Sequence, residues 1–231
     1  MVPFPTTPEP ASPADPPLFD LPSGARVPRR RVVLVTGPSG SGKTSLARRL
    51  GLPVVNLDDF YRDADHPGLP RRHGIVDWDS PATWDVEAAH AALLDACRSD
   101  RVDVPVYDIP TSQRTGTQTV DLDAAPLVLA EGIFAAELVD PLSRDGVLAD
   151  AVHLTQGRLV TFWRRLARDV GESRKPIAAL LRRGTHLLLA EPRMVRRWES
   201  QGTRPLAVEA AEHELRALAA HERTRHERHP T

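Results

Sequence analysis

The eight residues from Gly37 to Thr44 have the types and the spacing of a phosphate-binding loop. They complete the pattern G-x-x-x-x-G-K-[ST], in which backbone N–H groups surround phosphate oxygens. The chain has two lysines among its 30 basic residues, and one of them is Lys43. A compact ammonium fits between β- and γ-phosphates where a planar guanidinium does not, so this lysine indicates a nucleoside triphosphate site. The predicted nucleotide ligands in this segment are Gly37, Ser39, Gly40, Ser41, Gly42, Lys43, Thr44 and Ser45.

Acidic side chains follow two further apolar runs of the chain. Asp58 and Asp59 come at the end of one run, and Glu131 comes at the end of another. Ligands of open α/β sheets bind beyond the carboxyl ends of the strands, so these carboxylates are expected near the phosphate loop. They could hold Mg²⁺ together with the hydroxyl of Thr44, or accept a proton from an attacking hydroxyl. A turn or a helix cap is the alternative for the two aspartates.

The segments around the loop have the composition that would position it. Arg31–Thr36 is a short β-branched run typical of a buried strand, and Thr44–Leu50 offers good helix formers that end at Gly51. A strand, loop and helix in this order direct backbone N–H groups at a phosphate. Further strands are expected at Pro53–Leu57, Pro126–Ala130 and Asp150–Thr155. Helices are expected at Asp85–Arg98, at Arg158–Val170 and from about Val208, and the chain after Pro176 is expected to be mostly helical. Val102–Tyr107 and Thr117–Leu122 are expected to form a hairpin with Gly116 in its loop.

Strands that alternate with helices predict an α/β fold with a mainly parallel sheet and helices on both faces, here of the P-loop NTPase type. Residues 31–231 are expected to form one domain, because a chain of this length can bury one such core. Residues 1–30 are rich in proline and are expected to form a disordered arm.

Composition also limits the classes of function. The formal net charge is -1, so no basic field indicates a nucleic-acid partner. No apolar run reaches the length of a membrane span, and the single cysteine, Cys97, excludes an internal disulfide. These features favour a cytoplasmic protein with a small-molecule substrate, and they are compatible with a homo-oligomer.

A second group of cations lies between residues 158 and 175. Arg165 and Arg168 share a helical face, as do Arg164 and Arg168. One interpretation is a solvated basic helix that pairs with neighbouring acidic residues. The other is a set of cations that close over a phosphoryl group in transit. The pattern alone leaves both interpretations open.

The chain resembles the uridine kinase-like nucleoside kinases, P-loop kinases related to phosphoribulokinase and nicotinamide riboside kinase. The likeness runs from about Val32 to Pro176 and rests on the common order of five segments. These segments are the phosphate loop, Asp58–Tyr61, Trp78–Asp85, Val104–Asp108 with Arg114, and Glu131–Ile133; Arg164, Arg165, Arg168 and Asp169 then match the arginine pattern of the family's lid.

The resemblance implies an ATP-dependent kinase that uses Mg²⁺ and phosphorylates a nucleoside, in the first place the 5′-hydroxyl of uridine or cytidine. Asp58 would be the general base. Lys43, Arg165 and Arg168 would be the other catalytic groups, with the two arginines on a helical lid at about 158–176. The implied substrate ligands are Asp58, Tyr61, Asp79, Tyr107, Arg114 and Arg165, the implied Mg²⁺ ligands are Thr44, Glu131 and Asp58, and the implied further ATP ligands are Arg174 and Lys175.

Two positions depart from the family's pattern. Ser80 stands where the family has the histidine of F-D-H-P, and Ser112 aligns with the histidine that reads the pyrimidine base. The acceptor could therefore be another small metabolite, such as nicotinamide riboside, or the chain could be a non-catalytic ATP-binding protein. Because Asp58 is retained, a catalytic site is favoured over the last alternative. The sequence lacks the N-K-x-D motif of a GTPase.

Overall fold

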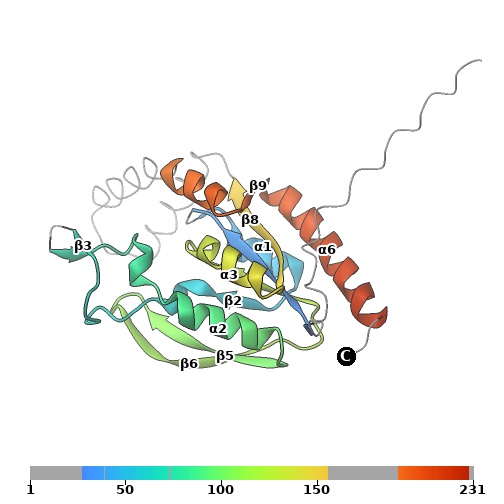
Figure 1. Ribbon diagram of the computed structural model, residues 1–231, viewed down its shortest axis with the longest axis horizontal. Helices are drawn as coiled ribbons and strands as arrows, with labels where there is room; N and C mark the ends of the chain where they lie inside the picture. The colour runs from blue at the N-terminus through green and yellow to red at the C-terminus, as the bar shows by residue number, and fades with distance from the viewer. Residues whose placement is uncertain (1–27, 39, 73, 156–191, 229–231) are drawn as a thin grey trace, which may run out of the picture.

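The structure is a computed structural model that describes residues 28–38, 40–72, 74–155 and 192–228. At its centre five strands form one sheet in the order β2-β7-β1-β8-β9, and each neighbouring pair is parallel (Figure 1). The predicted parallel sheet is confirmed, with the strand that precedes the phosphate loop in the middle. The strands are β1 (Arg31–Thr36), β2 (Val54–Asn56), β7 (Leu127–Glu131), β8 (Leu148–Thr155) and β9 (Arg204–Ala207).

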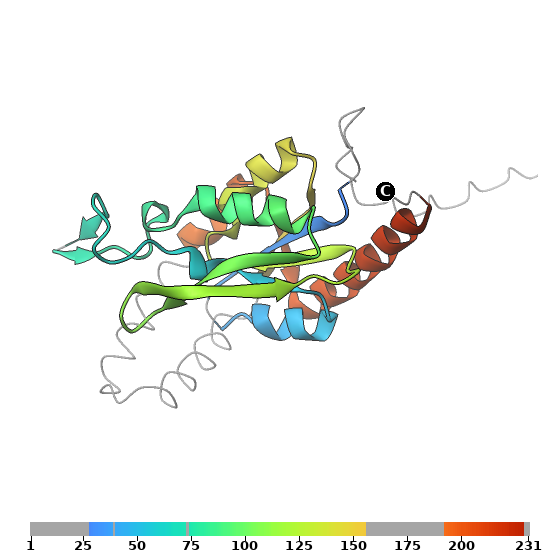
Figure 2. The ribbon, with the colours of Figure 1, turned by 90° about the horizontal axis from the view of Figure 1, so that it is seen from below.

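Helices cover both faces of this sheet, with α2 and α3 on one side and α1 and α6 on the other (Figure 2). The alternation of side chains along β1 requires cover on both sides. Val32 and Leu34 belong to the hydrophobic cluster beneath α2 and α3, whereas Val33 and Val35 belong to the cluster beneath α1 and α6. The helices are α1 (Lys43–Leu50), α2 (Val86–Ala96), α3 (Val139–Arg144), a helix at residues 192–200, and α6 (Val208–Arg228).

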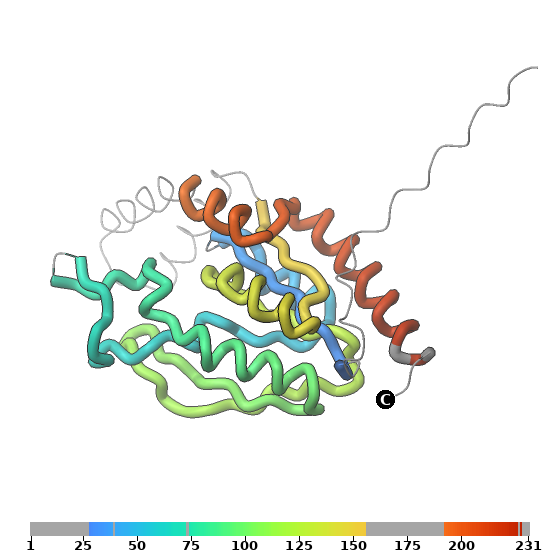
Figure 3. Tube along the Cα trace, viewed as in Figure 1, coloured from blue at the N-terminus to red at the C-terminus, as the bar shows by residue number. Residues whose placement is uncertain are grey.

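Among the residues that the structure describes, two antiparallel hairpins and three short 3-10 helices lie outside the sheet. The larger hairpin was predicted, but its strands are longer than expected, and Gly116 pairs with Val106 inside a strand instead of lying in the loop. The smaller hairpin was not predicted, and it lies at the opposite end of the molecule from α6 (Figure 3). The hairpins are β3 (Arg71–Arg72) with β4 (Ile75–Val76) and β5 (Arg101–Asp108) with β6 (Gln113–Asp121), and the 3-10 helices are η1 (Leu57–Phe60), η2 (Pro81–Thr83) and η3 (Ala135–Leu138).

The described chain after Pro176 is mostly helical, as expected, and β9 is an exception that was not predicted. Its sequence, Arg-Pro-Leu-Ala, is too short to show a strand pattern. It forms because the edge of β8 offers backbone partners to this segment. Pro205 is tolerated there because an edge strand can spare a backbone donor. The prediction of a helix from about Val208 is confirmed by α6.

Residue 30 is the expected end of the proline-rich arm, but Arg30 is 2% exposed and belongs to the folded domain. Its guanidinium donates to the carbonyl oxygens of Ala96 at 2.7 Å, Asp123 at 2.8 Å and Ala125 at 3.2 Å, and also to that of Ser99. These bonds join β1 to the turns that follow α2 and β6. The predicted boundary is therefore too late in the chain, while residues 1–27 lie outside the described residues.

Replacing Arg30 with alanine is expected to lower the free energy of unfolding by about 3 kcal/mol, because four carbonyl groups lose their donor at once. Urea denaturation followed by circular dichroism measures the change. Deletion of residues 1–27 is the matched control and is expected to leave the unfolding midpoint unchanged. Equal stability of the Arg30→Ala variant and the wild type would show that these hydrogen bonds do not hold the domain together.

Candidate active site

The loop between β1 and α1 contains a contact that requires glycine. Gly37 has a φ of 151°, and a Cβ on this residue would lie 2.8 Å from the Oγ of Ser41. Ser41 is buried, and within the described part of the chain its hydroxyl has no hydrogen-bond partner. Because a buried polar group without a partner is unfavourable, a phosphate oxygen bound in the loop would be stabilising. The loop therefore fits the phosphate-binding function predicted for it.

Lys43 is the first residue of α1 and is 8% exposed. Its Nζ donates to the carbonyl oxygens of Gly37 at 2.9 Å and Pro38 at 3.4 Å, so the ammonium lies against the start of the loop. Its positive charge also acts on the carboxylate of Asp58. The lysine thus contacts the phosphate loop, and its charge lowers the pKa of the predicted general base, Asp58.

Thr44 and Glu131, two of the three predicted magnesium ligands, are hydrogen-bonded to each other. The Thr44 hydroxyl donates to Oε1 of Glu131 at 2.8 Å. Glu131 ends β7, and in the sheet it lies between Val35 of β1 and Asn56 of β2. Parallel strands bring their carboxyl ends to one edge of the sheet, which is why residues 87 positions apart meet here.

Asp58 lies in the first turn of η1, directly after β2. The side chain of Asn56 caps this turn by accepting from the Asp58 backbone N–H at 3.2 Å. Oδ1 of Asp58 accepts from the backbone N–H of Ile133 at 3.4 Å. Burial raises the pKa of this carboxyl, while the Lys43 charge and the Ile133 N–H act in the opposite direction. A carboxylate with a raised pKa accepts a proton more readily, as a general base must.

Gly132 allows the turn of Asp58 to approach β7. A Cβ on Gly132 would lie 2.8 Å from the Cβ of Leu57 and 3.1 Å from Oδ1 of Asp58. A Gly132→Ala variant is therefore expected to lose about 2 kcal/mol of stability and to displace the carboxylate of Asp58. Thermal unfolding and phosphoryl transfer measure the two effects.

Gly116→Ala is the matched control for this variant. A Cβ on Gly116 meets no atom within 4 Å, and the residue lies in a strand, where alanine is compatible with the backbone. We expect this control to be as stable and active as the wild type. If Gly132→Ala behaves in the same way as the control, the close packing of these two turns is not required.

One cavity of about 960 Å³ joins the groups described above. The predicted residues among its lining are Gly40, Gly42, Lys43, Thr44, Ser45, Asp58 and Glu131. Another part of the wall was not predicted and consists of Arg49, Val208, Glu209 and Glu212. No local pattern could have indicated the last three, because they reach the cavity when the first turns of α6 pack beside α1.

An aromatic cluster surrounds Tyr61, the residue that follows η1. The ring of Tyr61 lies with its centroid 5.7 Å from those of Trp78 and Tyr107 and 5.9 Å from that of Phe134. The Tyr61 hydroxyl donates to the carbonyl oxygen of Trp78 at 3.3 Å. Asp79 is exposed, and its negative charge helps burial to raise the pKa of the Tyr61 hydroxyl. The structure therefore brings Tyr61, Tyr107 and Asp79 near one another, with the rings of Trp78 and Phe134 beside Tyr61.

The remaining predicted residues are placed differently. Arg114 is bonded to the protein itself, with its Nε 3.1 Å from the carbonyl oxygen of Tyr61. Ser112, one of the two positions that depart from the family pattern, has a φ of 53° and bonds to Ile109 through its hydroxyl. The predicted residues outside the described part of the chain are Ser39, Arg165, Arg168, Arg174 and Lys175.

The oxygen ligands at the sheet edge suit Mg²⁺. This ion prefers hydroxyl and carboxylate oxygens, and in phosphoryl-transfer sites one or two carboxylates and the substrate phosphates commonly hold it. Thr44 and Glu131 supply such a pair, with Asp58 lining the same cavity. Within the described ranges no group of three or more His, Cys, Asp or Glu side chains is placed to bind a metal.

A parallel sheet of this order, with a phosphate loop after its middle strand and carboxylates at the neighbouring strand ends, defines a P-loop kinase. Residues 32–181 match the model of the Phosphoribulokinase / Uridine kinase family, and the chain belongs to this family.

Individual relatives agree with this assignment. The chain is 33% identical over 180 residues to uridine kinase of Deinococcus deserti. The matched region covers 70% of this chain and 82% of that protein. It is 33% identical over 159 residues to uridine kinase of Schizosaccharomyces pombe, covering 65% of this chain, and it spans 34% of that protein's length. The fold is shared with a Silicibacter sp. TM1040 protein described as a putative fructose transport system kinase, with a TM-score of 0.56 and 23% identity. The match covers 81% of this chain and 91% of that protein.

Among the helices that the structure describes, none has the length and the apolar character that crossing a membrane would require.

Proposed function

We propose that this protein transfers the γ-phosphoryl group of ATP to a hydroxyl of a nucleoside, in the first place the 5′-hydroxyl of uridine or cytidine. The observation that carries the proposal is that Asp58, Lys43 and the Thr44–Glu131 pair line a single cavity. Membership of the Phosphoribulokinase / Uridine kinase family and the identity to uridine kinases support the same reaction.

Each group has a separate part in the proposed reaction. Asp58 accepts the proton of the acceptor hydroxyl, which it can do because burial raises its pKa. Lys43 and the backbone N–H groups of the loop hold the phosphates and offset their charge. Thr44 and Glu131, with Asp58 beside them, would hold Mg²⁺, which would neutralise charge on the phosphate oxygens. Arg165 and Arg168 belong to the proposed lid, and Arg174 and Lys175 to the proposed ATP contacts.

Tyr61, Tyr107 and Asp79 are proposed to bind the acceptor. Each tyrosine offers an aromatic ring on which a base can stack, with the two rings inclined at 41° to each other. The Asp79 carboxylate suits sugar hydroxyls because it accepts hydrogen bonds. Trp78 and Phe134 add two further rings beside Tyr61.

A second acceptor class is supported by Ser80 and Ser112. Neither side chain carries the imidazole that reads a pyrimidine in related enzymes, and the Ser112 hydroxyl is bonded to Ile109. Nicotinamide riboside, which presents a ribose hydroxyl on a different ring, fits the same catalytic groups.

A coupled assay of ADP release tests the proposal and separates the two acceptors. Purified protein with ATP and Mg²⁺ is given uridine, cytidine, other nucleosides and nicotinamide riboside in turn. Turnover with uridine or cytidine supports the first acceptor, and turnover with nicotinamide riboside alone supports the second. Tight ATP binding without turnover on the whole panel would indicate a non-catalytic ATP-binding protein.

A further inference from the structure

Arg114 binds the end of the turn that carries Asp58. Its Nε donates to the carbonyl oxygen of Tyr61 at 3.1 Å, and one terminal nitrogen donates to that of Phe60 at 3.3 Å. Phe60 ends η1, and the last carbonyl groups of a helix lack partners within it. A guanidinium is well suited to this place, because it is a fixed fork of donors and its positive charge is favourable at a helix C-terminus.

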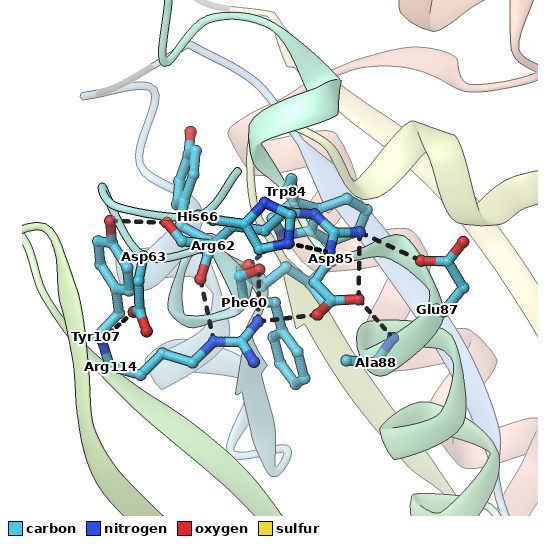
Figure 4. A network of polar contacts seen from close by, with 12 residues as sticks. Phe60, Arg62, Asp63, His66, Trp84, Asp85, Glu87, Ala88, Tyr107 and Arg114 are labelled. Atoms are coloured by element: carbon cyan, nitrogen blue, oxygen red, sulfur yellow. Dashed lines mark hydrogen bonds and ion pairs between the residues drawn. The ribbon is translucent and has the colours of Figure 1, made fainter. Parts of the chain in front are cut away.

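The same guanidinium is tied to α2. One terminal nitrogen lies 3.2 Å from Oδ2 of Asp85. Figure 4 draws this contact as a dashed line. Asp85 is the N-cap of α2, where Oδ1 accepts from the backbone N–H of Ala88 at 3.2 Å. Its own backbone N–H donates to the carbonyl oxygen of Phe60 at 3.0 Å. Arg114 and Asp85 therefore both donate a hydrogen bond to the carbonyl oxygen of Phe60, one from β6 and the other from the start of α2.

The hairpin holds three successive carbonyl groups of this segment. Besides the two that bond to Arg114, the carbonyl oxygen of Arg62 accepts from the Tyr107 hydroxyl at 3.3 Å (Figure 4). Tyr107 and Arg114 face each other across the hairpin. The segment from Asp58 to Arg62 is thus fixed by Asn56 at its start and by the hairpin at its end.

We infer that Arg114 is a positioning residue that, together with Asp85, fixes the turn bearing Asp58 and Tyr61, and that it does not bind the acceptor directly. Two of its side-chain nitrogens are engaged by Phe60, Tyr61 and Asp85. A displacement of Arg114 would therefore be expected to shift the position of the Asp58 carboxylate through the hydrogen bonds to Phe60 and Tyr61. The assignment of Asp58 as the base rests on the proposed function, whereas the anchoring of the turn does not.

Kinetics of Arg114→Gln, Asp85→Asn and the double variant test the inference. We expect each single variant to lower kcat on the order of tenfold to a hundredfold with an unchanged KM for ATP, because the base is misplaced while the phosphate loop is intact. The double variant is expected to be no slower than the slower single variant. Arg114→Lys keeps the charge without the fork and is expected to recover part of kcat.

Arg101→Gln is the matched control, because Arg101 lies on the same hairpin and pairs with Asp121 at an exposed site. It is expected to keep the wild-type kcat. A rise in the KM for the acceptor with kcat unchanged in Arg114→Gln would make Arg114 a substrate ligand and overturn the inference. Additive losses in the double variant would also overturn it.

Hydrogen exchange tests the anchoring without any acceptor. Backbone amides from Asp58 to Arg62 are expected to exchange on the order of tenfold faster in Arg114→Gln, while those of α1 exchange at the wild-type rate. Unchanged exchange in Asp58–Arg62 would overturn the inference. If the wild-type protein turns over no acceptor, the proposed function fails, and exchange alone still decides whether Arg114 and Asp85 hold the turn.

Discussion

A Lys43→Ala variant is expected to lose on the order of a thousandfold in turnover with whichever acceptor the wild-type protein phosphorylates. Lys43 is buried, lies against the carbonyl oxygens of Gly37 and Pro38, and acts on Asp58 through its charge. Its removal takes away the positive charge that offsets the phosphates beside the base. Steady-state ADP release measures the loss, and circular dichroism verifies that the variant is folded.

Two further variants make this result specific. Lys43→Arg keeps the charge, but a planar guanidinium does not fit the narrow place between the loop carbonyls and a phosphate, so we expect it to be nearly as slow. Arg48→Ala removes an exposed cation from the same helix and is expected to keep the wild-type rate. An active Lys43→Ala variant would mean that the loop does not hold the transferred phosphate.

An Asp58→Asn variant is expected to be on the order of a thousandfold slower in phosphoryl transfer while it binds ATP as the wild type does. The amide keeps the shape of the side chain and can still accept from the N–H of Ile133, but it cannot take a proton from the acceptor. Single-turnover kinetics measure the rate, and calorimetric titration measures ATP binding.

Asp59→Asn is the matched control, because this carboxyl lies in the same turn and bonds to Asn56 and to the backbone N–H of Tyr107. It holds neighbouring groups in place, so the variant is expected to keep most of its activity. If Asp59→Asn is the slower of the two variants, the base has been assigned to the wrong carboxylate.

The nucleotide side of the site could be predicted from the sequence because its signals are local. A phosphate loop is a contiguous segment, and the β-branched run before it and the helix formers after it are contiguous too. Gly51 has a φ of 63° and caps α1, as its place after Leu50 indicates. The carboxylates could be added because parallel strands end at one edge of the sheet, which is a general rule of the fold class.

The acceptor side and its supports depend on contacts between distant segments. The resemblance implied Arg114 as a substrate ligand, because it accompanies the family motif Val104–Asp108. In the structure its guanidinium meets carbonyl groups more than 50 positions earlier in the chain. Similarly, Arg30 belongs to a proline-rich segment by composition but to the core by its hydrogen bonds.

The sequence by itself determined the class of this protein, since a phosphate loop, the alternation of strands and helices, and the order of its motifs are read along the chain. The tertiary structure decided which polar groups act on a ligand and which hold other residues in place. The physical reason is that a side chain's role depends on the partners that surround it. For a guanidinium such as that of Arg114, those partners come from η1 and α2, and no local pattern specifies them.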